Sequence, residues 1–227
     1  MEKQITYIRR WKEYAFLGAL TFMCFSFSMT RYHFTDSRIF LFLNWNLFLA
    51  FIPWVLTQLT ILTPRIERSK IAIFLLMLVW LLFFPNAPYI LTDLIHLKHR
   101  SNVPMWFDLI LILSFAWTGL MYGLMSLWEI ERILGNFFKR KYEIFLSMGL
   151  LFLCSFGVYL GRFLRWNSWD VINEPDLIIQ DTLDRLINPL QHPSTWGLTI
   201  LLGIFLNIVY LSFELLKNRT SLKESTS

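Results

Sequence analysis

Six long segments with few charged residues occupy most of this 227-residue chain. They cover residues 11–29, 39–62, 71–91, 107–128, 144–161 and 196–216. A helix needs roughly 20 mostly apolar residues to cross a bilayer, and within lipid only helices and closed barrels satisfy all their backbone hydrogen bonds. The sequence therefore predicts an all-α integral membrane protein, with about six transmembrane helices bundled in a single domain over residues 1–227.

Composition excludes an ordinary soluble domain. The chain is 56% hydrophobic and 16% charged, whereas soluble domains carry about a quarter charged residues. The net charge of +5 does not indicate a nucleic-acid partner, because the basic residues follow membrane topology. Cys24 and Cys154 both lie inside apolar segments and form no disulfide framework. The expected partner is the lipid bilayer of the cell membrane, which the chain crosses several times.

The basic residues also predict an orientation. If the N-terminus is cytoplasmic, two thirds of the 21 Lys and Arg residues fall on the cytoplasmic side. Cytoplasmic loops carry an excess of Lys and Arg, so both termini are expected inside the cell.

The unusual polar residues are then all predicted at the outer ends of the spans. They are Asn44, Asn46, Asn86, Asp93, His96, Asp108, Arg162, Arg165, Asn167 and Asp170. Polar groups are costly at membrane depth, so their convergence requires either a function or mutual pairing.

The third span is expected to open near its outer end. Pro85 and Pro88 each remove a backbone donor and disfavour helix in the residue before them. Asn86 is suited to bond the backbone groups that are freed, and a short helix is expected to restart at Thr92 or Asp93, either of which can cap it. A simple helix end at the membrane interface is the alternative interpretation.

Asp93 and His96 are the candidate catalytic residues. Their spacing of three puts them on one helical face, and a carboxylate beside an imidazole can orient it as a general acid or base. With His99 the same face offers metal ligands, but zinc-type spacings are missing and no metal is predicted. A surface pair without chemical function is the other interpretation. Nothing in the sequence names a cofactor.

Arg162 and Arg165 are candidates for binding an anionic group. Arginine forks bind phosphate and carboxylate in a bidentate manner, which suggests an anionic lipid or a lipid-linked substrate. Trp166 and Trp169 flank them, so a helix end with an interfacial aromatic belt is an alternative. A further alternative pairs the arginines with nearby aspartates in a salt-bridge network.

The remaining substrate-binding candidates are polar residues from several segments. They are Asn167, Asp170, Asn86, Asn44 and Asp108. Asn44 and Asn46 are more typical of asparagines that bond across helices, and Asp108 also suits the first turn of a helix, where the dipole favours a carboxylate.

A short amphipathic helix is expected before the last span. Proline at position 175 suits the first position of a helix, and Asn188-Pro189 ends the pattern. An apolar stripe opposes an acidic face, which predicts a helix on the outer surface that serves as a lid or as a connector. The stripe consists of Ile179, Leu183, Leu186, Ile187 and Leu190.

Two glycine pairs have the spacing that lets helices approach closely. Gly119 and Gly123 lie in the fourth span, and Gly157 and Gly161 lie in the fifth. Contacts within the bundle are the favoured interpretation and dimerisation is the alternative. The oligomeric state is left open.

Four stretches together resemble the family of bacterial multi-pass membrane proteins catalogued as domain of unknown function 1361. They cover residues 42–47, 84–89 with 92–97, 106–108 and 161–170. His99 lies outside the pattern. The resemblance spans about residues 39–170 and implies a protein of the bacterial cytoplasmic membrane and cell envelope, with no assigned activity.

Three hypotheses for function follow. The first is an enzyme that faces the outer leaflet and acts on a lipid-linked or anionic cell-envelope substrate. The second is a non-catalytic membrane scaffold or assembly factor. The third, a transporter, is disfavoured because residues 75–82 and 149–154, near the middle of their spans, carry no charge.

Overall fold

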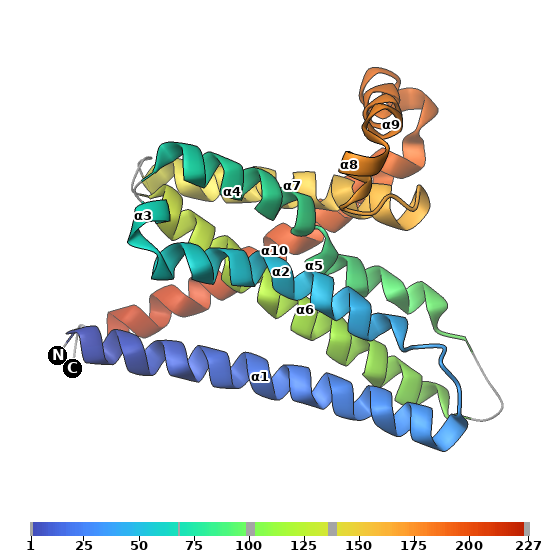
Figure 1. The fold of residues 1–227 in the computed structure, drawn as a ribbon, viewed down its shortest axis with the longest axis horizontal. Helices are drawn as coiled ribbons and strands as arrows, with labels where there is room; N and C mark the ends of the chain where they lie inside the picture. Colours follow the sequence, from blue (N-terminus) through green and yellow to red (C-terminus); the bar gives the residue numbers. More distant parts are fainter. Residues whose placement is uncertain (1, 68, 99–102, 136–139, 225–227) are drawn as a thin grey trace. The chain divides into compact units, whose positions relative to one another are not determined.

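The computed structural model describes residues 2–67, 69–98, 103–135 and 140–224 and contains helices but no strand in these ranges (Figure 1). The predicted all-α fold is therefore confirmed. The chain divides into two compact units, residues 1–130 and 131–227, which are described separately.

The helices follow the predicted segments, with several short helices between them. Their bounds are α1 Glu2–Thr35, α2 Phe42–Leu62, α3 Pro64–Glu67, α4 Lys70–Phe83, α5 Asn86–Tyr89, the 3₁₀-helix η1 Ile90–His96, α6 Met105–Leu134, α7 Arg140–Phe163, α8 Asp170–Asn173, α9 Pro175–Ile187, the 3₁₀-helix η2 Pro189–Gln191 and α10 Pro193–Glu224.

Within the described residues, five segments are long and apolar enough to cross a membrane. They are Phe42–Leu62, Lys70–His96, Met105–Leu134, Glu143–Phe163 and Pro193–Lys217. The protein is thus a multi-pass membrane protein. The sixth expected span lies within α1, whose 34 residues extend about 50 Å. Because α1 is less apolar than the five, its crossing and the orientation of the termini stay predictions.

In the first unit, α5 packs closely against α6. A Cβ added at Gly119 would lie 2.8 Å from the carbonyl oxygen of Ala87, and one at Gly123 would lie 2.8 Å from the Ala87 Cβ. These glycines allow a close approach inside the unit, so the interpretation as contacts within the bundle is confirmed for this pair. The same interpretation of Gly157 and Gly161 stays a prediction.

The proline-containing break is shorter than expected. α4 ends at Phe83 and helical structure resumes at Asn86, so the predicted restart at Thr92 or Asp93 was wrong. Pro85 occupies the N-cap of α5 and Pro88 lies in its first turn, where the missing N–H groups have no intrahelical partner in any case. As predicted, Asn86 bonds the opened backbone: its Nδ2 donates to the carbonyl of Phe83 at 2.9 Å.

The second unit is built on α7 and α10, which pack along each other. Gly203 lies directly against the ring of Phe152, and the rings of Phe156 and Trp196 are 6.0 Å apart. α8, α9 and η2 form the connection between the two long helices (Figure 1). As predicted, α9 has Pro175 at its start and ends before Asn188.

Candidate functional site

Polar side chains gather at one end of the first unit, which we call the polar end. It consists of the last turns of α1, the first turns of α2 and α6, and η1. Hydrogen bonds and ion pairs join Ser28 to Asn44, Arg31 to Asp108, and Asn46 to Asp93. Residues up to 77 positions apart in sequence thus meet because antiparallel helices bring their ends together.

Asp93 is the centre of the predicted catalytic pair. Its carboxylate is fully buried, and Oδ2 accepts a hydrogen bond from Nδ2 of Asn46 at 3.0 Å. Oδ1 lies 4.0 Å from Nε2 of His96. The pair belongs to a 3₁₀-helix, in which residues three apart eclipse one another. The fold therefore presents a buried carboxylate to the imidazole from directly beneath it.

His96 is open on its other side. Its side chain is 48% exposed, and the ring of Phe42 meets it edge-on with centroids 5.7 Å apart. At 4.0 Å the Asp93 contact is an ion-pair distance rather than a hydrogen bond, and such contacts in ligand-free sites commonly tighten when substrate binds. This arrangement allows the imidazole to exchange a proton with a molecule at the polar end.

Asp108 is held by a partner that the sequence analysis did not single out. Nε of Arg31 donates to its Oδ1 at 2.9 Å and Nη2 donates to Oδ2 at 3.3 Å. Both side chains are almost completely buried, and the Arg31 guanidinium also lies 5.0 Å from the centroid of the Phe40 ring. Arg31 itself was a signal in the sequence, since it follows the apolar segment 11–29. An arginine that is buried at such a position requires an acidic partner.

Asn44 and Asn46 bond across helices as the sequence suggested. Nδ2 of Asn44 donates to Oγ of Ser28 at 2.8 Å, which joins α2 to α1, while Asn46 joins α2 to η1. Oδ1 of Asn44 is buried without a hydrogen-bond partner. Nδ2 of Asn86 donates to the carbonyl of Phe83 at the end of α4.

Arg162, Arg165, Asn167 and Asp170 belong to the second unit, at the end of α7. Arg165 is exposed and adopts a left-handed backbone conformation with φ of 64°, a role that glycine usually fills at helix ends. The amide nitrogen and Nδ2 of Asn167 both donate to Oδ2 of Asp170, at 2.7 and 2.9 Å. Asn167 and Asp170 therefore stabilise the turn between α7 and α8.

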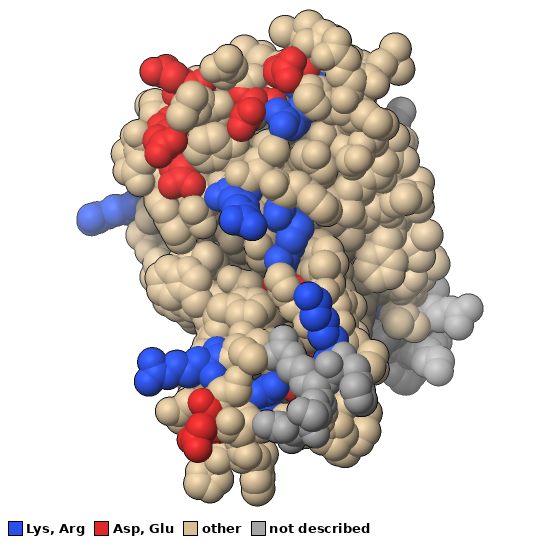
Figure 2. Space-filling model, turned by 90° about the vertical axis from the view of Figure 1, so that its right-hand side faces the viewer, with Lys and Arg blue, Asp and Glu red and all other residues tan. Residues whose placement is uncertain are grey.

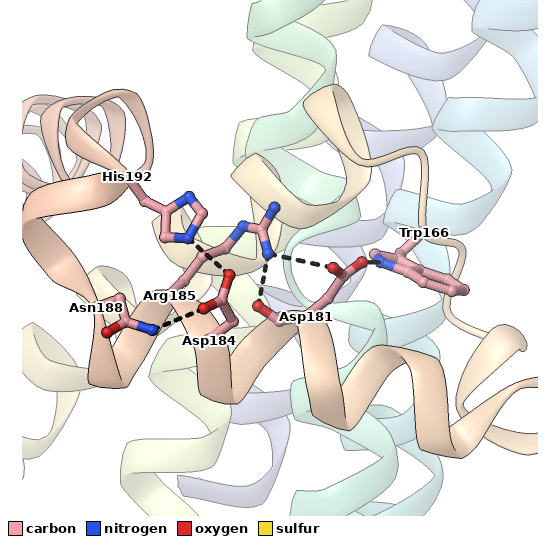
Figure 3. Close-up of polar contacts among 6 residues, drawn as sticks. All are labelled: Trp166, Asp181, Asp184, Arg185, Asn188 and His192. Carbon is pink, nitrogen blue, oxygen red and sulfur yellow. Dashed lines mark hydrogen bonds and ion pairs between the residues drawn. The ribbon is translucent and has the colours of Figure 1, made fainter.

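A second polar network in this unit was not predicted. Nε1 of Trp166 donates to Oδ2 of Asp181 at 2.8 Å, and Nη1 of Arg185 donates to Oδ1 of the same carboxylate at 3.3 Å (Figure 3). Arg185 is buried although it carries a charge. This network attaches α9 to the end of α7.

The end of α9 is attached to the start of α10 by Asp184. Its Oδ2 lies 2.8 Å from Nε2 of His192, and its Oδ1 accepts from Nδ2 of Asn188 at 2.8 Å (Figure 3). The hydrogen bond from Asn188, followed by that from His192, lowers the pKa of the Asp184 carboxyl below its ordinary value. Helical spacing does not indicate this contact, because the turn at Pro189 separates the two partners.

Buried and half-buried polar groups also lie at the opposite ends of the units. In the first, Gln58 accepts from the Tyr14 hydroxyl at 2.9 Å. In the second, Glu131 accepts from the hydroxyls of Tyr210, at 2.6 Å, and Ser147. The sequence analysis did not single out Glu131, which lies near the end of the candidate span Met105–Leu134.

No group of three or more His, Cys, Asp or Glu residues is placed to hold a metal ion within the described ranges. Asp93 and His96 lie close together as two potential ligands. His99, the third ligand considered from the sequence, lies outside the described residues.

Comparison with known proteins gives one match. A family model described as "Protein of unknown function (DUF1361)" matches residues 45–209. The matched range includes Asn46, Asp93, His96 and the whole connection between α7 and α10. No curated protein and no solved structure matches the chain.

Proposed function

Since the chain belongs to the DUF1361 family of proteins of unknown function, we propose its activity from its own residues: an enzyme that faces the outer leaflet of the cell membrane. It acts on a lipid-linked or otherwise anionic cell-envelope substrate. His96 is the general acid or base, Asp93 orients it, and Arg162 and Arg165 bind the anionic group.

The arrangement of Asp93 is the observation that carries this proposal. A carboxylate without solvent exposure is bonded through one oxygen to Asn46 and faces a half-exposed imidazole with the other. Burying a carboxylate is costly unless it is paired, and a pair serving only stability has no need of an imidazole half open to its surroundings. A positioned imidazole supplies proton transfer at neutral pH.

The backbone of Arg165 supports the second part of the proposal. A non-glycine residue at positive φ is strained, and such strain is typical of functional positions. Arg165 keeps this conformation with an exposed side chain, where a glycine would relieve it. Its guanidinium group is suited to a phosphate or carboxylate.

The test is complementation of a strain that lacks the protein, with envelope lipids and polymers profiled in parallel. His96→Ala and Arg165→Ala are expected to insert normally and to fail to restore the wild-type profile. His33→Ala is the matched control, because His33 is an exposed histidine at the end of α1, and it is expected to complement. Full complementation by both His96→Ala and Arg165→Ala would refute the enzyme.

A non-catalytic scaffold is the second candidate. Mutual pairing of polar groups favours it, since Arg31 is paired with Asp108 and Asn167 with Asp170. A scaffold requires the folded surface but no proton transfer. It therefore predicts that His96→Gln, which keeps the polarity and approximate size of the side chain, complements as well as wild type, whereas the enzyme predicts that this variant fails.

A further inference from the structure

The connection between α7 and α10 carries a row of exposed apolar side chains. Ile172 on α8 is 81% exposed, Ile187 at the end of α9 is 72% exposed and Leu190 on η2 is 94% exposed. The exposed face of α9 continues the row. It consists of Ile179, Leu183, Leu186 and Ile187. Exposed apolar patches of this kind mark an interaction surface.

The opposite face of α9 is attached to the second unit. Arg185 is buried there, where Nη1 donates to the carbonyl of Asp181 at 2.7 Å and Nε1 of Trp196 donates to the carbonyl of Arg185 at 3.1 Å. Trp166 holds Asp181 from the end of α7. The bonds from Trp166 and Trp196 thus set the rotation of α9 about its axis, and the apolar face points away from the helices to which it is attached.

The position of the connection in the chain identifies what covers this face. α7 ends at Phe163 and α10 begins at Pro193, and both belong to segments long and apolar enough to cross a membrane. The connection must therefore lie at the bilayer surface where the two spans emerge. Trp166, Trp169 and Trp196 lie at its two ends, and tryptophan prefers the interface between lipid and water.

The charges of the connection select the kind of lipid. Residues 170–191 contain one basic residue, Arg185, which is buried and bonded to Asp181. Acidic side chains gather at the top of the view in Figure 2, and residues 170–191 contain five acidic residues. They are Asp170, Glu174, Asp176, Asp181 and Asp184. An acidic rim disfavours an anionic surface.

We propose that α9 is an interfacial helix whose apolar face lies in the bilayer, in the leaflet where α7 ends, against neutral zwitterionic lipids. Helices with a large apolar face and a charged opposite face enter the boundary between head groups and acyl chains in this way, to a depth of about 5–10 Å. Ile172 and Leu190 extend the inserted surface beyond the two ends of α9. This inference does not depend on the proposed enzyme activity.

The test uses the whole chain, reconstituted in phosphatidylcholine vesicles and carrying one fluorescent label. Cys24→Ser and Cys154→Ala remove the native thiols, and Leu186→Cys provides the label site on the apolar face. Asp184→Cys is the matched control, because the Asp184 side chain is 47% exposed on the same helix and lies about 160° around the axis from Leu186. Brominated lipid quenches a label in the acyl region, and iodide quenches a label in water.

The proposal predicts several-fold stronger quenching by brominated lipid at Leu186 than at Asp184, and the reverse order for iodide. Equal iodide quenching at both sites would overturn it, since the face would then lie in water. Protection of Leu186 from both quenchers would also overturn it, because a protein surface would cover the face. Replacing part of the phosphatidylcholine by an anionic lipid is expected to leave the quenching unchanged or weaker, and a several-fold increase would contradict the choice of neutral lipid.

Discussion

The ion pair between Arg31 and Asp108 gives a sharp prediction for stability. Asp108→Asn removes the carboxylate charge and leaves the guanidinium buried, with its side chain 4% exposed. Breaking a buried pair from one side costs about 3–5 kcal/mol. Arg31 retains its hydrogen bond to Oγ1 of Thr35 at 2.8 Å and its contact with the Phe40 ring, so we expect a value near the lower limit, about 3 kcal/mol.

Removing both charges is expected to cost much less. The double variant Arg31→Met with Asp108→Leu replaces the pair by apolar side chains of similar volume, a change that is often neutral or stabilising. We expect its free energy of unfolding to lie within about 1 kcal/mol of wild type. The charges then contribute to the specificity of the polar end rather than to its net stability.

The assay is unfolding in mixed micelles by titration with a denaturing detergent, followed by tryptophan fluorescence. Asp36→Asn is the matched control, since Asp36 is an exposed carboxylate next to the end of α1 with φ of 50°, and asparagine tolerates this conformation equally well. A loss below about 1 kcal/mol for Asp108→Asn, or a double variant as unstable as the sum of the two single variants, would show that the pair is not buried as described.

Three further predictions concern the backbone and pH. Gly119→Ala places a Cβ 2.8 Å from the backbone oxygen of Ala87 and is expected to destabilise by about 1–3 kcal/mol in the same detergent titration. Gly149→Ala, with open space around its Cβ, is expected to stabilise α7 by up to about 1 kcal/mol, and equal losses for the two would contradict the close packing. Arg165→Gly relieves the positive φ and is expected to raise the free energy of unfolding by up to about 1 kcal/mol while abolishing complementation; a lower free energy of unfolding would contradict the strain. The pKa of Asp184 is lowered in the folded protein, so its contribution to stability is present above its ordinary pKa and is lost as the pH falls through the lowered value. The free energy of unfolding is measured between neutral pH and about pH 2. It should fall less on acidification in Asp184→Asn than in wild type, and an unchanged profile would contradict the prediction.

The spans and their glycine contacts were predictable because lipid leaves the chain few options. An apolar segment must be helical to satisfy its backbone in a bilayer, which is why residues 42–62 and 193–217 agree with the predicted spans. Gly119 is followed by Gly123 on the same helical face, a spacing that indicates close packing on its own. Local hydrogen bonds were equally accessible, as the contact from Asn86 to Phe83 shows.

Contacts between distant segments were harder to predict. Arg31 and Asp108 are 77 positions apart, and the sequence offers several aspartates as partners for each arginine. Asp184 and His192 are separated by the turn at Pro189, so helical periodicity does not relate them. Geometry beyond the helix is needed in both cases, because side chains meet there through the path of the backbone rather than through their spacing.

The residue at which helical structure resumes after the proline-containing break was not predictable from the sequence. Pro85 and Pro88 suit the N-cap and first turn of a helix as well as they suit an open segment. The chain adopts the former and continues into the 3₁₀-helix η1. The consequence for the candidate site is favourable, since the tighter helix holds Asp93 directly below His96.

The most direct test of the proposed acid–base pair is a double-mutant comparison in the complementation assay. Asp93→Asn, His96→Gln and the double variant are compared at equal levels of inserted protein. Substitutions in groups that act as one unit have strongly non-additive effects. We therefore expect the double variant to restore the envelope profile as well as the less active single variant does, and all three variants to restore it far less than wild type. Near-normal restoration by both single variants would contradict the account.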